Sequence, residues 1–226
     1  MIAKELQKRI LSSIILIPIA IFFILQEAWF FLFFLSICFL VTSYEWIKMN
    51  KIVSFKVIGV SYLFFAFIFT YLLRETFSLG LFVLILIICI FTDLGGYIFG
   101  KFLKGPKLIK ISPQKTYSGA FGGFILSLVA ALVYSKYTEI GFATHLNFSI
   151  WNEEAVSKIY YLFVMIISFT SQVGDLIISY FKRLAKIKDT GNLLPGHGGL
   201  LDRIDGMIFA FPFSYIIFKT NIFSIF

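Results

Sequence analysis

Apolar residues dominate this chain in long runs, and the charged residues fall mainly between the runs. Each run is about 17 to 25 residues long, which is the length that an α-helix needs to cross roughly 30 Å of hydrocarbon. The pattern therefore predicts an all-α fold, a polytopic bundle of about seven transmembrane helices. We place these spans at residues 10–26, 28–47, 56–73, 79–99, 119–136, 159–179 and 204–219.

The composition agrees with a membrane protein. Of the 226 residues 59% are hydrophobic, 30 are Phe, and the mean hydropathy is +0.93, which excludes an ordinary soluble domain. We expect one integral membrane domain over residues 1–226, with anchoring helices in 1–78 and catalytic helices and loops in 79–226. Basic residues precede the first span as in a signal peptide, but no small-residue cleavage motif follows it, so we expect it to remain as an anchor.

The basic residues sort to one side of these spans. With the N-terminus in the cytoplasm, 16 of the 20 lysines and arginines lie in cytoplasmic segments. The outer segments keep only Arg74, Lys136, Lys158 and Lys219. This asymmetry follows the positive-inside rule and predicts a multi-pass protein of the cell (inner) membrane. The net charge of +8 then reflects orientation and attraction to anionic lipid, and we expect no nucleic-acid partner.

The side chains that commonly bind zinc are isolated from one another. Cys38 and Cys89 each lie in an apolar run without a second Cys or a His at ligand spacing, so neither zinc nor a disulfide is expected. His197, in "PGHGG", has no companion histidine on its side of the membrane. We expect it to make a phosphate contact or a hydrogen bond within its loop.

Four acids at one leaflet are the candidates for chemistry. Asp93 and Asp175 lie near the inner ends of the fourth and sixth spans, where burial of a carboxylate costs about 2.5 to 3.5 kcal/mol. Asp202 and Asp205 stand three residues apart where the last span begins, so both can face one object. Carboxylates that converge in this way are suited to hold Mg²⁺ for phosphate chemistry.

Each acid also has a structural alternative. Asp93 could bond to neighbouring backbone in a Gly-rich kink. Asp175 could form an ion pair with Arg183, which shares its helix face. Asp202 and Asp205 could be charges that favour a helix N-terminus, an effect of about 0.3 to 1 kcal/mol.

Two inner loops combine lysine with Gly and Pro, at residues 101–123 and 182–199. Lys101, Lys104 and Lys186 are explained by topology alone. Lys115 differs because Ser112, Pro113 and Thr116 surround it with hydroxyl groups and a rigid turn. Phosphate sites use such lysines together with exposed backbone N–H groups, although the P-loop pattern is absent from this chain.

The segment "SYFKRLAKIKDTGNLLPGHGGLLDRIDG", residues 179–206, resembles the signature of the phosphatidate cytidylyltransferase (CDP-diacylglycerol synthase) family. The matching positions are Ser179, Lys182, Arg183, Lys188, Asp189, His197, Gly198, Gly199, Asp202, Arg203 and Asp205. The upstream segments "DLGGYIFGKFLKGPKLIKISPQKTYSG" and "QVGDLIISYFKR" are similar to two other family motifs. Gln114, Tyr117 and Ser118 depart from the family pattern in the first of them.

The resemblance implies transfer of a cytidylyl group from CTP to phosphatidic acid, with release of pyrophosphate, in phospholipid biosynthesis at the cytoplasmic face. It implies Mg²⁺ on Asp175 and Asp202, with a second cation left open, and support from Asp205. Lys182, Arg183 and Arg203 would neutralise phosphate. The expected substrate-binding residues are Asp93, Ser112, Lys115, Thr116, Ser179, Lys188, Asp189, His197, Gly198 and Gly199. Membrane lipids are expected partners, and a homodimer is left open.

Other function classes fit the pattern less well. Ion-coupled transporters also carry intramembrane acids beside broken helices, but their sites usually lie near the midplane, whereas these acids gather at one face. CDP-alcohol phosphotransferases would show D-G-x-x-A-R, which "DRIDGMIFAF" lacks. A CTP-dependent kinase of polyprenols or other lipid alcohols is the nearest rival.

Overall fold

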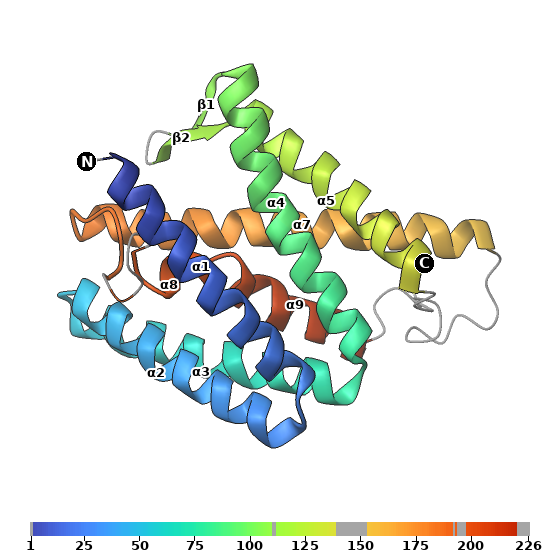
Figure 1. Ribbon diagram of the computed structural model, residues 1–226, viewed down its shortest axis with the longest axis horizontal. Coiled ribbons are helices and arrows are strands. Elements are labelled where there is room, and N and C mark those ends of the chain that lie inside the picture. The colour runs from blue at the N-terminus through green and yellow to red at the C-terminus, as the bar shows by residue number, and fades with distance from the viewer. Residues whose placement is uncertain (1, 110–111, 139–152, 192, 194–197, 221–226) are drawn as a thin grey trace.

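The computed structural model describes residues 2–109, 112–138, 153–191, 193 and 198–220 (Figure 1). Most of them are helical. The elements are α1 (Ile2–Leu25), α2 (Ala28–Met49), α3 (Val53–Thr76), α4 (Leu79–Leu103), β1 (Lys107–Ile109), β2 (Ser112–Thr116), α5 (Tyr117–Thr138), α7 (Glu153–Leu184), α8 (Leu201–Ile204) and α9 (Met207–Thr220). The predicted helical membrane protein is confirmed, and the antiparallel β1–β2 hairpin is an addition to it.

Five helices in the described part of the chain are long and apolar enough to cross a membrane. They are 28–49, 53–76, 79–103, 117–138 and 158–184. Two shorter apolar helices, Ile14–Leu25 and Met207–Thr220, correspond to the first and last predicted spans. The protein is thus a multi-pass membrane protein, while the count of seven crossings and the cytoplasmic N-terminus remain predictions.

The helix α7 is the longest element and runs through the middle of the molecule (Figure 1). It packs against α4, α5 and α9, and its buried residues Phe163, Val164 and Ile167 join the main apolar core. Its 32 residues span about 48 Å, which exceeds the hydrocarbon thickness. The end of α7 that carries Lys182 and Arg183 therefore extends beyond the predicted span, toward the hairpin and α8.

Glycines let α4 and α5 pack backbone to backbone, and these two helices make the most extensive contact in the fold. A Cβ atom on Gly95 would lie 2.4 Å from the carbonyl oxygen of Gly122, and one on Gly119 would lie 2.7 Å from that of Gly96. The helix α4 is continuous from Leu79 to Leu103, so the chain is not broken at the glycines that follow Asp93.

The hairpin between α4 and α5 is held by the start of α5. Thr116 Oγ1 accepts a hydrogen bond of 3.0 Å from the backbone N–H of Gly119, which is an N-cap contact. The N–H of Tyr117 donates to the carbonyl of Pro106 at 3.1 Å. The hairpin, the start of α3 and the end of α7 gather on the left side of Figure 1, so the lysine-rich segments share one side of the bundle.

Candidate active site

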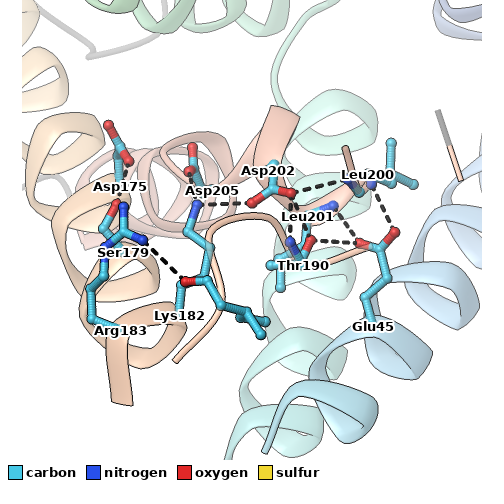
Figure 2. A network of polar contacts seen from close by, with 12 residues as sticks. Glu45, Asp175, Ser179, Lys182, Arg183, Thr190, Leu200, Leu201, Asp202 and Asp205 are labelled. Atoms are coloured by element: carbon cyan, nitrogen blue, oxygen red, sulfur yellow. Dashed lines mark hydrogen bonds and ion pairs between the residues drawn. The ribbon is translucent and has the colours of Figure 1, made fainter. Parts of the chain in front are cut away.

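The last turns of α7 carry the polar residues Asp175, Ser179, Lys182 and Arg183. Ser179 Oγ donates a hydrogen bond of 3.2 Å to Asp175 Oδ1. The guanidinium group of Arg183 donates to the carbonyl of Ile187 at 3.1 Å (Figure 2). The alternative in which Asp175 pairs with Arg183 is therefore wrong, because the guanidinium group is exposed and bonds to the backbone that follows its own helix.

Asp175 forms its ion pair with Lys115 of β2 instead. Each side chain is 25% exposed, so the pair stays open to a ligand. Both residues line a cavity of about 190 Å³ between α4, α5, α7 and the hairpin. Asp93 and Thr116 line the same cavity. The structure thus brings together the two predicted membrane acids, the predicted phosphate-binding lysine and a hydroxyl group.

Lys182 occupies the space between the other two acids. Its ammonium nitrogen lies 2.8 Å from Asp202 Oδ1 and 4.0 Å from Asp205 Oδ2. All three side chains are nearly buried, with 11%, 8% and 10% of their surface exposed. Figure 2 shows the carboxyl groups of Asp175, Asp205 and Asp202 in a row beside Lys182 and Ser179. The predicted site therefore forms one cluster at the end of α7.

The two acids beside Lys182 differ in their electrostatics. Burial raises the pKa of Asp205 well above its usual range, and the charges of Asp175 and Asp93 raise it further, while Lys182 opposes them. Burial would also raise the pKa of Asp202, but hydrogen bonds from Lys182, Thr190 and Gly199 outweigh it and lower the pKa. Asp202 is thus held as a carboxylate, whereas burial and the neighbouring acids disfavour the charged form of Asp205.

Thr190 and Gly199, which both precede α8, donate hydrogen bonds to Asp202. Asp202 Oδ2 accepts hydrogen bonds from the N–H of Thr190 at 2.7 Å, from its hydroxyl at 3.0 Å and from the N–H of Gly199 at 3.0 Å. A Cβ atom on Gly198, whose φ is +88°, would lie 3.0 Å from the same oxygen. These glycines were predicted to let backbone approach phosphate, but here they let it approach Asp202.

The alternative role of Asp202 as a helix-end charge is partly supported, since the Gly199 N–H precedes α8. Asp205 lies between α8 and α9, directly before the last helix begins at Met207, which agrees with its predicted place at the start of the last span. Its carboxylate accepts a hydrogen bond of 2.9 Å from the N–H of Gly206.

The remaining predicted site residues lie around this cluster or outside the described residues. Lys188, Asp189 and Arg203 are exposed near this cluster. Ser112 lies in β2, and His197 lies outside the described residues.

Two residues of the cluster were not predicted. Glu45 of α2 and Thr190 are both buried, and the Thr190 hydroxyl lies 3.2 Å from Glu45 Oε2. A signal for Glu45 was present in the sequence, because it is an acid at the inner end of an apolar span, as Asp175 is. Thr190 carries no comparable signal.

The carboxylate oxygens of this cluster suit a hard cation, such as Mg²⁺, that also binds phosphate oxygens of a substrate. Within the part of the chain that the structure describes, no three His, Cys, Asp or Glu side chains stand close enough together to enclose a metal ion. Mg²⁺ usually takes only one or two carboxylates from the protein and completes its shell with water and phosphate oxygens. The acids in Figure 2 fit that arrangement, since Asp175 is partly exposed and Asp205 lies beside it in the same row of carboxyl groups.

Comparison with known proteins identifies the family. The sequence profile of the cytidylyltransferase family matches residues 50–221. The chain belongs to the cytidylyltransferase family. Its relatives include phosphatidate cytidylyltransferases of Staphylococcus epidermidis and Staphylococcus aureus, each 35% identical over 190 residues, which are 81% of this chain and 67% of the relative. The enzyme of that name from Staphylococcus saprophyticus is 34% identical over the same shares. The resemblance found in the sequence is confirmed, and all of the cluster at the end of α7 except Glu45 lies within the matched region.

Proposed function

We propose that this cytidylyltransferase transfers the cytidylyl group of CTP to phosphatidic acid and forms CDP-diacylglycerol. A phosphate oxygen of phosphatidic acid forms a bond to the α-phosphorus of CTP. The bond from that phosphorus to the oxygen bridging to the β-phosphate breaks, and the β- and γ-phosphates leave as pyrophosphate. No covalent enzyme intermediate is needed, so the protein must supply in-line positioning and neutralisation of charge.

The observation that carries this proposal is the pairing of Lys115 with Asp175 at an open cavity beside Lys182. Two phosphate-bearing substrates bring several negative charges into one place. A lysine that is paired with a carboxylate in the absence of substrate can exchange that partner for phosphate without a large change of position. Lys115 and Lys182 are both placed for such an exchange, since each ammonium group contacts an aspartate.

The other roles follow from the contacts. Ser179 holds Asp175 in orientation through its hydroxyl group. Lys182 would turn from Asp202 toward the phosphates of CTP, and the exposed Arg183 and Arg203 would add charge at the rim. Asp93 would orient a ligand or the hairpin from the wall of the cavity.

Mg²⁺ is proposed as the cofactor, on Asp175 and Asp202 with support from Asp205. When bound, it would neutralise charge on the nucleotide phosphates and on the leaving pyrophosphate. Of the two predicted ligands, Asp202 keeps Oδ1 for a cation only if Lys182 withdraws, because Oδ2 already accepts three hydrogen bonds. Asp205 is the alternative ligand beside Asp175, and substitution of each acid distinguishes the two arrangements.

The position of the cluster supports a lipid substrate. The lysine-rich segments lie on the same side of the bundle as the hairpin and the end of α7 (Figure 1), which supports an active site at the cytoplasmic face. Phosphatidic acid could then keep its acyl chains in the bilayer while its headgroup reaches the cavity between α4 and α7.

The test is a substrate panel with the purified protein in detergent. We expect a nucleotidyl lipid from phosphatidic acid, Mg²⁺ and CTP, and little or none with ATP, GTP or UTP. Formation of a phosphorylated lipid alcohol, with no cytidylyl lipid, would instead support the CTP-dependent kinase.

A further inference from the structure

The carboxylate of Glu45, at the inner end of α2, is buried against the chain that carries Asp202. Only 3% of the residue is exposed. Its Oε1 accepts a hydrogen bond of 2.9 Å from the N–H of Leu200, and its Oε2 accepts one of 2.8 Å from the N–H of Leu201 (Figure 2). A carboxylate buried in this way is unfavourable without such donors. These two hydrogen bonds therefore connect the start of α8 to α2, a helix far away in the sequence.

Thr190 connects Glu45 to Asp202. Its hydroxyl oxygen lies 3.2 Å from Glu45 Oε2 and 3.0 Å from Asp202 Oδ2. A hydroxyl group has one hydrogen, so it donates to one carboxylate at a time and is shared between the two. The backbone N–H of Thr190 donates to Asp202 as well, at 2.7 Å. A continuous set of hydrogen bonds thus runs from Glu45 through Thr190 and Asp202 to Lys182.

The backbone at Gly191 and at Gly199 lies close to the Glu45 carboxylate. A Cβ atom on Gly191 would lie 2.8 Å from Oε1, and one on Gly199 would lie 2.6 Å from Oε2 and 2.1 Å from the Thr190 hydroxyl oxygen. At both positions the backbone therefore lies closer to Glu45 than a residue with a Cβ atom would allow. Gly199 is also the residue whose N–H donates to Asp202, so the position of Asp202 depends on the same contact.

We propose that Glu45 is a positioning residue for Asp202 in the cytidylyltransferase reaction. It fixes both ends of the loop that supplies hydrogen bonds to Asp202, and it thereby sets the direction in which Asp202 Oδ1 meets Lys182 and a cation. The inference rests on the proposed function and extends it, because it gives a helix of the N-terminal segment, which was expected only to anchor the chain, a part in the active site.

The experiment compares Glu45→Gln with wild type and with Glu75→Gln. Gln keeps the size of the side chain, but its NH₂ group must face an N–H donor, so one of the two bonds to α8 is lost. Glu75 is a matched control, since it pairs with Arg74 at the other end of the bundle. We expect Glu45→Gln to lower kcat about ten-fold or more and to raise the Mg²⁺ concentration for half-maximal activity, with Glu75→Gln unchanged in both.

A second readout does not depend on turnover. The melting temperature of the protein in detergent is measured against Mg²⁺ concentration without CTP. A merely structural role would lower the melting temperature at every Mg²⁺ concentration equally. A positioning role also shifts the midpoint of the Mg²⁺-dependent rise to a higher concentration, and this shift is what we expect for Glu45→Gln.

Thr190 keeps the proposal testable if Glu45→Gln does not fold. Thr190→Ser retains the shared hydroxyl group, whereas Thr190→Val removes it and leaves the Glu45 contacts to Leu200 and Leu201. Thr190→Val should raise the Mg²⁺ concentration for half-maximal activity about three-fold or more, whereas Thr190→Ser should keep it at the wild-type value. Equal Mg²⁺ midpoints in wild type, Glu45→Gln and Thr190→Val would overturn the positioning role. Wild-type protein that forms no cytidylyl lipid would instead contradict the proposed function itself.

Discussion

Lys115 and Asp175 form an ion pair that joins the hairpin to α7 at the cavity that both residues line. The two residues are 60 positions apart, and each was predicted from a different local feature, the lysine from its hydroxyl-rich turn and the acid from its place in an apolar span. Their contact means that the hairpin, which we propose to bind phosphate, and the acidic cluster lie at one site.

The first prediction concerns this lysine. Replacement of Lys115 by Ala should lower kcat/KM about ten-fold or more, roughly 1.4 kcal/mol, because the variant loses a charge that meets phosphate and leaves Asp175 without its partner. Gln114→Lys, which restores the family pattern at the neighbouring position, should be tolerated. Steady-state kinetics with varied CTP measures both. Equal activity of wild type and Lys115→Ala would leave Lys115 with a topological role only.

The second prediction concerns the acids proposed to hold Mg²⁺. Asp175→Asn and Asp202→Asn should each nearly abolish product formation, since Asn keeps the size of the side chain but removes the charge that a divalent cation needs. The double variant should be hardly worse than either single one, because groups that act as a unit are not additive. Chelation should inactivate the wild type, and Mg²⁺ should restore it.

Asp205→Asn belongs in the same assay. If it abolishes activity while Asp202→Asn retains near wild-type turnover and Mg²⁺ dependence, Asp205 is the ligand beside Asp175, and Asp202 has the helix-end role. All three variants should remain extractable in folded form, which gel filtration in detergent checks.

Much of the fold could be predicted from the sequence because the signal is local. Apolar runs of sufficient length specify helices in lipid, and the spacing of Asp175, Ser179 and Lys182 placed them on one face of α7. The partners of these residues could not be predicted in the same way. Lys182 contacts Asp202, Thr190 donates to Asp202, and Leu201 donates to Glu45 of α2. No periodicity in the sequence reports such long-range contacts.

The third prediction tests the α4–α5 contact that supports the hairpin. Gly95→Ala should lower the melting temperature, because its Cβ would lie 2.4 Å from the Gly122 carbonyl oxygen and the two helices would have to separate, at a cost of about 1 to 3 kcal/mol. Gly96→Ala is the matched control, since the nearest atom to its Cβ is 3.8 Å away. It should be neutral or slightly stabilising, because Ala is favoured over Gly within a helix. Equal melting temperatures of the two variants would contradict this account of the packing.

The fourth prediction concerns orientation. Single cysteines in place of Lys107 and Lys188 should react with a membrane-impermeant thiol reagent only from the cytoplasmic side, and one in place of Asn152 only from outside. Asn152 lies outside the described residues, so its side follows from the predicted spans alone. The native Cys38 and Cys89 are buried and should add little background. Labelling of positions 188 and 152 from the same side would contradict the seven-span arrangement.

The central claim is that the site transfers the cytidylyl group of CTP to phosphatidic acid, and the fate of labelled phosphorus tests it most directly. Purified protein is incubated with phosphatidic acid, Mg²⁺ and CTP labelled at either the α- or the γ-phosphate, and lipid and aqueous products are separated. We expect the α-label in the lipid fraction and the γ-label in pyrophosphate. Transfer of the γ-label to lipid, with the α-label left in CDP, would contradict the claim and show a lipid kinase instead.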